Sequence, residues 1–573
     1  MYSDGVEITN PIGAAKGKHK IVQVFYSLLQ IPREQRSQVD RIQLLMIFKK
    51  KLVKRYGMKK LFQYLISDLL KLESGIMVDY PARRLIKFGV LVYSADNLEA
   101  HHIGGFSMSF SSKDICRFCH AQHCDLLCKI HDYVDASKHA YWTVNEYDKI
   151  CDSLQDASDE EQLDISGAEE TDNELGSSED ERNVSEDEMN VDRHGLRGRC
   201  PLNRLQSFHA CINLPPDAMH DLLEGVVAQD LNGIIRIFVE EGMFTIEQYN
   251  DKLRTLALNS QEASDRPQEL IEKTKSKKLQ GKAGSLWCHM RNFPLIIKSF
   301  VAKIGADHTV LLLAVKLHEM TNRISAIEFR NHEIDELEDL VIEYLNLRME
   351  VFEIYPEILG TAKPKHHFLT HYAQAIRLFG PPRSFWTARW ESKHRVGKNL
   401  AEAAKNFRNI THTLSYRQQM RMASIYYSGM FQTNDFVIPE DAVFGKNLEK
   451  ERMSWHRFKQ YVDELDLICN DIFASSYKYT IGDVVVISLI DGLYEMNVGL
   501  IKAIVIKDNV VWFIVKVYEA QLYYPGYYET KISVENHTLC KANDLADKKP
   551  LNKHGTQDKF QFILHHHISF DNT

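Results

Sequence analysis

Cysteine and histidine residues in this sequence have the types and spacing of a metal site. Cys116 and Cys119 form a Cys-x-x-Cys pair, which places two thiolates on one side of a tight loop and suits tetrahedral zinc. Two further ligands are needed. Nearby candidates are His120, His123, Cys124 and Cys128; distant candidates lie in Lys365-His-His-Phe-Leu-Thr-His-Tyr372, as His366 with His371, or as His367 with His371 at i, i+4 spacing.

Acidic residues flank these candidate ligands at equal distances along the chain. Asp96 precedes Cys116 by 20 residues, and Glu391 follows His371 by 20 residues. The order is therefore acid, Cys-x-x-Cys, long insertion, His-x4-His, acid. Carboxylates are ligands that Mg²⁺ prefers, whereas thiolate and imidazole suit zinc.

This order resembles that of the CACTA/EnSpm-like (CMC-type) DDE transposases, which are related to the Transib transposases and to the catalytic core of the V(D)J recombinase. The resemblance covers roughly residues 1–430. Five segments carry it: Ser3-Asp-Gly-Val-Glu-Ile-Thr-Asn-Pro-Ile-Gly13, Ala95-Asp-Asn-Leu-Glu-Ala-His-His-Ile-Gly-Gly105, Pro215-Pro-Asp-Ala-Met-His-Asp-Leu-Leu-Glu-Gly225, Pro364-Lys-His-His-Phe-Leu-Thr-His371 and Phe385-Trp-Thr-Ala-Arg-Trp-Glu391.

The resemblance implies an α/β fold, with an RNase H-like core interrupted by a zinc-clamped, mostly helical insertion. It implies that Asp4, Asp96 and Glu391 are catalytic and bind Mg²⁺ or Mn²⁺. It also implies a structural zinc ion held by Cys116, Cys119, His366 and His371. The function would be two-metal cleavage and strand transfer of a cut-and-paste DNA element, by a nuclear homodimer that binds transposon ends and target DNA.

Each acid also has a simpler interpretation. Asp4 precedes a glycine and is typical of a turn, while Asp96 is typical of a helix N-cap after a strand. Glu391 could pair on a helix surface with Arg395 at i, i+4. Asp217, in Asp-x-x-His, is a rival for the catalytic role because other transposase groups show a similar motif.

Basic residues surround Glu391 and would hold DNA phosphates, although a solvated helix face is the alternative. They are Arg383, Arg389, Lys393, Arg395, Lys398, Lys405 and Arg408, of which we predict DNA contacts for Arg389, Lys393, Arg395 and Lys398. The basic run Phe48–Arg55 is either a nuclear import signal or a helix face.

Such transposases carry a DNA-binding module ahead of the first Asp, whereas only Met1–Ser3 precede Asp4 here. The second hypothesis is therefore a shortened, catalytically silent descendant that binds DNA or chromatin. A third is an RNase H-like nuclease without strand transfer.

Composition favours a large intracellular protein of several domains. The 573 residues carry a net charge of -8, but residues 152–192 alone contain 17 acidic residues against Arg182, which leaves +8 on the rest of the chain. No apolar run approaches the ~20 residues of a membrane span, and nothing in the sequence indicates a small-molecule substrate.

Hydrophobic patterns predict four parts of the chain. Residues 1–112 begin the core, with strands over 21–29 and 86–92 and helices over 38–56 and 59–73. Residues 113–365 form the insertion, with helices over 217–238 and 331–351 and a disordered acidic loop at about 150–195. Residues 366–475 complete the core and a helical tail. Residues 476–573 form a small β-rich, SH3-like barrel.

Overall fold

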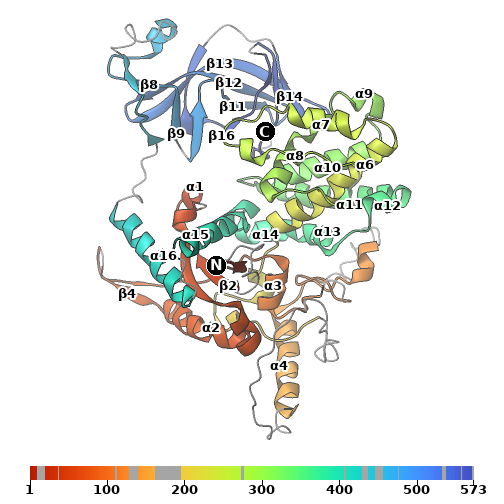
Figure 1. Cartoon of the computed structure of the whole chain (residues 1–573), viewed down its shortest axis with the longest axis vertical. Helices are drawn as coiled ribbons and strands as arrows, with labels where there is room; N and C mark the ends of the chain where they lie inside the picture. The colour runs from red at the N-terminus through yellow and green to blue at the C-terminus, as the bar shows by residue number, and fades with distance from the viewer. Residues whose placement is uncertain are drawn as a thin grey trace.

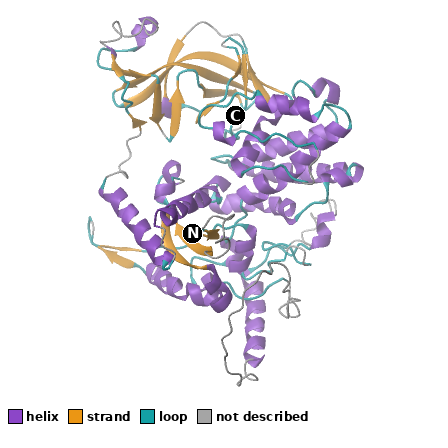
Figure 2. Ribbon diagram, viewed as in Figure 1, coloured by secondary structure: helices purple, strands orange, loops and turns teal. Residues whose placement is uncertain are grey.

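The structure of the protein is a computed structural model that describes residues 1–8, 20–36, 38–79, 81–109, 113–127, 140–161, 195–272, 277–404, 408–428, 436–445, 456–474, 476–531, 537–556 and 558–570. The described part is mixed α/β, with more helix than strand. Figures 1 and 2 show three regions, which we call the sheet region (1–109 and 388–428), the helical region (195–387) and the β-region (436–570). Among the described residues, no helix is both long and apolar enough to cross a membrane.

The sheet region contains a small antiparallel sheet with helices on both faces. Its elements are β1 (Tyr2–Glu7), β2 (Lys20–Tyr26), α1 (Arg33–Arg36), β3 (Gln43–Lys49), α2 (Lys50–Ser74), β4 (Ile76–Val78), β5 (Arg84–Ile86), α3 (Asn97–Gly104), α15 (Ala388–Ala404) and α16 (Ile410–Tyr427). The strand order is β1-β2-β3. Alternate residues of β2 reach opposite cores: Val22 and Val24 pack in the cluster that contains Phe62 of α2, whereas Ile21 packs in the cluster of Ala401 and Leu414. β2 is buried from Ile21 to Phe25 because both of its faces are covered.

The segment before Asp96 lies beside β1. Ser94 forms a parallel bridge with Tyr2, and the Ser94 N–H donates to the Met1 carbonyl at 2.8 Å. Helix α3 begins immediately afterwards, and Asp96 is its N-cap, with Oδ1 accepting from the Glu99 N–H at 2.7 Å. Asp96 therefore stands next to the strand that carries Asp4.

Two predictions for this region need correction. Residues 43–49 form strand β3 rather than part of a helix, because this run pairs with β2 along its whole length. Residues 86–92 do not form a regular buried strand: β5 pairs with β4 in a hairpin, and Leu91 is exposed. The helix predicted over 59–73 is confirmed within α2, which bends at Gly57.

The helical region has one large apolar core. Its elements are a π-helix (Met219–Val227), α6 (Ala228–Glu240), α7 (Ile246–Arg254), α8 (Ala283–Ile297), α9 (Val301–Ile304), α10 (Thr309–Ile324), α11 (Asn331–Ile354), α12 (Pro356–Leu359), α13 (Pro364–Phe368) and α14 (Tyr372–Phe379). Two further helices, α4 (Val144–Glu161) and α5 (Ala210–Asn213), pack instead in the core that contains Phe62 of α2. The π-helix and α6 are buried on nearly all sides at its centre. The predicted helices over 217–238 and 331–351 are thus confirmed in type.

The acidic segment is helical at its beginning. Helix α4 extends to Glu161, so the predicted disordered loop is wrong for residues 150–161. Residues 162–194 lie outside the described residues.

The β-region contains a curled sheet built on one long hairpin and a separate three-stranded sheet. Its strands are β6 (Phe436–Val437), β7 (Val443–Phe444), β8 (Leu467–Cys469), β9 (Asp471–Ala474), β10 (Tyr477–Thr480), β11 (Val484–Asp491), β12 (Glu495–Lys507), β13 (Val510–Tyr523), β14 (Tyr527–Thr530), β15 (His537–Lys541), β16 (Asp547–Leu551), β17 (His554–Gly555) and β18 (Phe560–Phe562). Asp508 and Asn509, both with positive φ, connect β12 to β13 in a two-residue turn. Because β8 pairs with β12, this region begins before the predicted boundary at 476.

Buried ion pairs join the β-region to the helical region. Glu262 is 4% exposed and accepts from Arg291 of α8 at 2.8 Å and from Lys549 of the β-region at 2.8 Å. Glu333 of α11 lies 2.8 Å from Nε2 of His567. These carboxylates take partners from both regions, so separating the regions would leave buried charges unpaired.

We predict that Glu262→Gln destabilises this interface strongly, because it leaves Arg291 and Lys549 buried without their counter-ion. Removing one partner of a buried pair costs about 3–5 kcal/mol. Urea unfolding followed by tryptophan fluorescence should show the loss. Glu269→Gln, which changes an exposed carboxylate paired with Arg254, is the control and should leave the unfolding midpoint unchanged. Equal midpoints for the two variants would contradict the prediction.

Candidate metal centre and acid site

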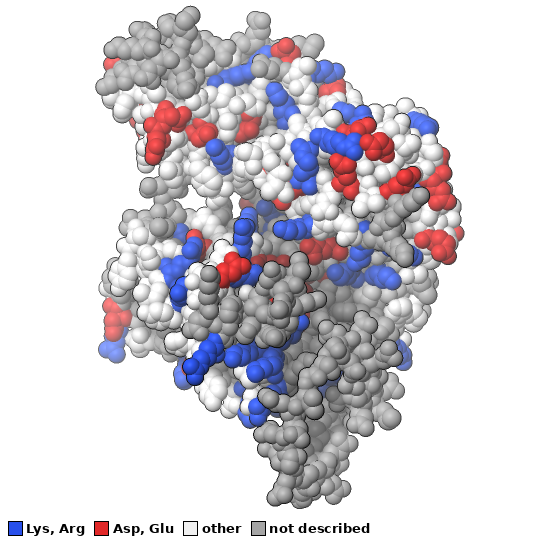
Figure 3. Space-filling view, viewed as in Figure 1, with Lys and Arg blue, Asp and Glu red and all other residues white. Residues whose placement is uncertain are grey.

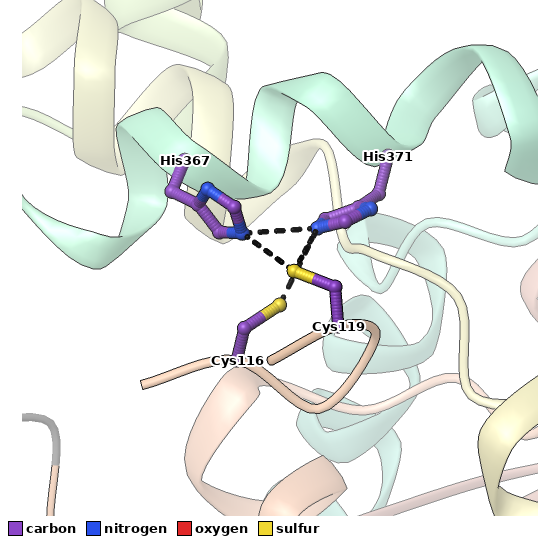
Figure 4. Close-up of side chains that lie close together, drawn as sticks. All are labelled: Cys116, Cys119, His367 and His371. Carbon is purple, nitrogen blue, oxygen red and sulfur yellow. Dashed lines mark hydrogen bonds between the residues drawn. The ribbon is translucent and has the colours of Figure 1, made fainter. Parts of the chain in front are cut away.

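Two cysteines and two histidines converge in a buried cluster (Figure 4). Cys116 and Cys119 come from a loop held by the Ile115 N–H to Ala121 carbonyl bond, at 3.2 Å. His367 in α13 and His371 one turn later point at them from the helical region. The four ligating atoms lie within 4.8 Å of one another, and all four residues are buried.

The distances in this cluster suit a tetrahedral zinc ion. Cys116 Sγ lies 3.3 Å from His371 Nε2, Cys119 Sγ lies 3.3 Å from His367 Nε2, and the two Nε2 atoms are 3.1 Å apart. Ligands at zinc-bond length on tetrahedral corners stand about 3.3 to 3.8 Å from one another. Tyr141 Oη, 3.2 Å from His371 Nδ1, orients that ring from outside. The residues therefore fit a closed, structural zinc site.

Burial and mutual contacts shift the pKa values of three of these four groups. Burial raises the pKa of the Cys116 thiol, but its hydrogen bond with Cys119 and the neighbouring His371 outweigh burial and lower that pKa well below its usual range. The same hydrogen bond, with burial, raises the pKa of Cys119. Burial lowers the pKa of His371, so its ring stays neutral, which is the form that binds a metal.

The structure corrects one predicted ligand. His366 points away from the cluster and into the helical core, where its Nε2 lies 3.1 Å from Asp230 beside Arg348. His367 takes its place, because i, i+4 spacing sets His367 and His371 on one helix face. The nearby candidates do not join them: His120 lies 3.2 Å from Glu146, Cys124 is exposed, and Cys128 lies outside the described residues.

The three predicted acids share one locality although 92 and 295 residues separate them in sequence. Asp4 lies in β1, Asp96 caps α3 beside β1, and Glu391 lies in the first turn of α15. Burial, followed by the charges of Asp96 and Glu391, raises the pKa of Asp4 to about 6. The carboxylates are therefore close enough to repel one another.

These carboxylates do not form a compact cage. Within the part of the chain that the structure describes, the Cys/His cluster is the only group of three or more ligating side chains whose atoms lie within 4.8 Å. The three acids are neighbours, and their side chains would have to move closer together to hold one cation.

His220 holds Glu391 from the helical region. Its Nε2 lies 3.1 Å from Glu391 Oε1, and its Nδ1 lies 2.6 Å from Asp217 Oδ2. Burial opposes the charge on this ring, but the hydrogen bonds to Asp217 and Glu391 raise the pKa of His220 to about 11. Thr387 in turn donates to Asp217 through its N–H at 2.8 Å and its hydroxyl at 2.7 Å. Asp217 is thus a buried support, and Glu391 pairs with His220 rather than with Arg395.

A second histidine faces Asp4. His394 of α15 has Nδ1 2.9 Å from Gln23 Oε1 and Nε2 3.7 Å from Asp4 Oδ2. Burial lowers the pKa of His394 to about 4, so this ring is neutral while His220 is charged. We did not predict either histidine; the signals were the spacings Asp217-x-x-His220 and Glu391-x-x-His394. Glu391 and His394 lie on the same side of α15, whereas Asp217 lies just before the π-helix that carries His220.

The predicted DNA-contacting residues separate into two groups. Arg389, Arg395 and Lys398 are exposed on α15. Lys393 is 2% exposed, and its ammonium donates to the Val39 carbonyl at 2.9 Å. This hydrogen bond joins α15 to the turn at Val39, and burial lowers the pKa of Lys393 to about 8. Lys393 is therefore not on the exposed face of α15. Lys405 lies outside the described residues.

We predict about one zinc ion per chain, and that His367 rather than His366 holds it. His367→Asn should abolish zinc retention because it removes a ligand. His366→Asn is the matched control: it should keep zinc, although losing a hydrogen bond to buried Asp230 lowers stability. Elemental analysis in metal-free buffer measures the zinc content of both histidine variants. Cys116→Ser serves as a second variant that should lack zinc. Retention by His367→Asn together with loss by His366→Asn would reverse the assignment.

A scan against protein-family models finds no model that matches the chain. A search of curated proteins finds no matching relative. The function is therefore argued from the residues and their geometry.

Proposed function

We propose that this protein is a DDE-type transposase-like enzyme of the CACTA/EnSpm-like kind, which cleaves DNA and transfers strands with two divalent cations. Its catalytic core would be RNase H-like, with Asp4 and Asp96 at neighbouring strand positions and Glu391 on a helix. The parallel bridge between Tyr2 and Ser94 and the position of Glu391 on α15 support this arrangement.

One observation carries the proposal. Asp96 and Glu391, distant in sequence, both act electrostatically on Asp4 and contribute to its raised pKa of about 6. Clustered carboxylates repel one another, so the cluster itself does not stabilise the fold. Such a cluster is typical of a site that a bound cation completes.

Each acid would have a definite role in that site. Bound Mg²⁺ or Mn²⁺ would activate the attacking water or 3′-hydroxyl and stabilise the leaving oxygen. Asp4, Asp96 and Glu391 would supply the carboxylate oxygens that such hard cations prefer. His220, charged and anchored by Asp217, would hold the Glu391 carboxylate at the edge of the site. His394, neutral, would pack beside Asp4 without adding charge.

Exposed basic residues would hold the DNA backbone in a salt-dependent manner. Arg389, Arg395 and Lys398 lie on the helix of Glu391. A second group of basic side chains, visible over the position of α2 in Figure 3, comprises the exposed residues Lys51, Arg55, Lys59 and Lys60. Transposon ends and target DNA would be the partners, with a homodimer joining two ends in the nucleus, and the zinc ion would be structural.

A catalytically silent descendant that binds DNA or chromatin is the second candidate. The ion pair between His220 and Glu391 favours it, because the charged histidine neutralises a carboxylate that the proposed reaction requires. The two candidates share the fold and the zinc ion, and they differ in whether the protein cleaves DNA.

We predict that the protein binds Mn²⁺ at the acids and that Asp96→Asn abolishes both this binding and DNA cleavage. Asparagine keeps the shape and still caps α3, so folding, zinc content and DNA binding should persist. Electron paramagnetic resonance titration measures Mn²⁺, and plasmid nicking measures cleavage. Asp79→Asn, an exposed change in the β4–β5 hairpin, is the control. Binding of Mn²⁺ without cleavage would favour the silent descendant, and absence of both from the unaltered protein would sink the enzyme proposal.

A further inference from the structure

A buried arginine stands between the two cysteine ligands. Arg117 is 1% exposed, and its guanidinium lies 4.3 Å from the ring centre of Phe118 and 5.5 Å from that of Phe368. Phe368 follows His367 directly. Arg117 therefore touches both halves of the Cys/His cluster, the loop through its own backbone and α13 through Phe368.

The same guanidinium binds the two segments that lead to the acid site. Nη1 donates to Asn97 Oδ1 at 2.7 Å, and Asn97 is the residue after Asp96. Nη2 donates to the Pro215 carbonyl at 2.9 Å and Nε to the Leu214 carbonyl at 3.3 Å. Pro215 and Leu214 precede Asp217, the anchor of His220.

A buried carboxylate closes this network. Asp221 is fully buried, accepts from the Asn97 side-chain amide, and accepts from the Asp217 N–H at 3.1 Å. Its charge opposes the effect of burial, which lowers the pKa of Arg117. A continuous set of hydrogen bonds thus runs from the cysteine loop through Asn97 and Asp221 to Asp217, and from there through His220 to Glu391.

The energetics make this connection specific. A buried guanidinium has five N–H donors in a rigid fork, and it is stable only where acceptors meet that geometry. The acceptors here come from α3 and from the segment before the π-helix, whereas the guanidinium position is set by the cysteine loop. Displacing the loop would leave these polar groups unpaired, at a cost of several kcal/mol.

We propose that Arg117 is a positioning residue that couples the Cys116, Cys119, His367 and His371 metal centre to the acid site, so that the filled metal centre sets the geometry of Asp96 and Glu391. The coupling acts through Asn97 on the Asp96 side and through Asp221 and Asp217 on the Glu391 side. Its effect on cation binding rests on the proposed function, but its effect on the order of these two segments does not.

The test compares the unaltered protein with Arg117→Met, which keeps apolar volume and removes all three hydrogen bonds. Hydrogen exchange is followed in peptides covering residues 97–104 and 214–223, with zinc bound and after removal by a chelator. In the unaltered protein, zinc removal should raise exchange in both segments and leave α10 and α11 unchanged. In Arg117→Met, exchange there should already be raised with zinc bound, and zinc removal should add little.

Acid-site metal affinity gives the second readout. Loss of an outer-shell partner typically weakens binding about 10- to 100-fold, and we expect a loss in that range for Mn²⁺ with Arg117→Met at unchanged zinc content. Arg291→Met, which removes another arginine that is 2% exposed, is the matched control and should leave Mn²⁺ affinity and both peptides unchanged. Asn97→Ala, which breaks one link and keeps the bonds of Arg117 to Leu214 and Pro215, replaces Arg117→Met if that variant does not fold.

The outcomes distinguish a failure of the coupling through Arg117 from a failure of the proposed function. If Arg117→Met, or Asn97→Ala in its place, retains zinc with exchange in both segments and Mn²⁺ affinity unchanged, the coupling is absent. If the unaltered protein binds no Mn²⁺ at the acids, the proposed function fails, while the exchange of the two segments still decides whether Arg117 couples them to the metal centre.

Discussion

The contact between the Cys116–Cys119 loop and the His367–His371 turn is the constraint on which the arrangement of the molecule depends. It joins positions about 250 residues apart, and everything between them is the helical region with α4. Two thiols and two imidazoles buried together are satisfied best by a metal that all four ligate. The chain runs from α13 through α14 into α15, so the contact between the cysteine loop and α13 also fixes the position of Glu391 relative to the sheet.

Other buried charges extend the same principle through the molecule. Asp230, Arg348 and His366 join α6, α11 and α13 within the helical core. Glu262 and Arg291 form another buried ion pair, at the boundary with the β-region. In each case the partners come from separate elements, and a buried charge without its partner is strongly unfavourable. Relative placement is therefore specified by polar groups, while apolar burial supplies most of the stability.

Two features reduce the repulsion among the three acids. A positively charged His220 lies against Glu391, and a raised pKa of about 6 lets Asp4 hold a proton more readily than an exposed carboxyl does. His394 stays neutral because burial, together with the positive charge of Lys398, lowers its pKa to about 4. Both histidines face acids from helical elements, so the site is assembled from the sheet region and the helical region together.

The sequence by itself indicated the Cys/His metal centre. The Cys-x-x-Cys pair and the distant histidines could be chosen from residue type and spacing, whereas the three acids were chosen from the family resemblance. The long apolar periods at 217–238 and 331–351 indicated helices correctly because such patterns depend only on local geometry. Residues 43–49 were misread because a short apolar run satisfies helical and strand periods alike, and only pairing with β2 decides between them. The choice of His367 over His366, the burial of Lys393 and the capture of Glu391 by His220 also required the tertiary structure. Each depends on which side of a helix faces which distant segment, and the local sequence does not determine that orientation.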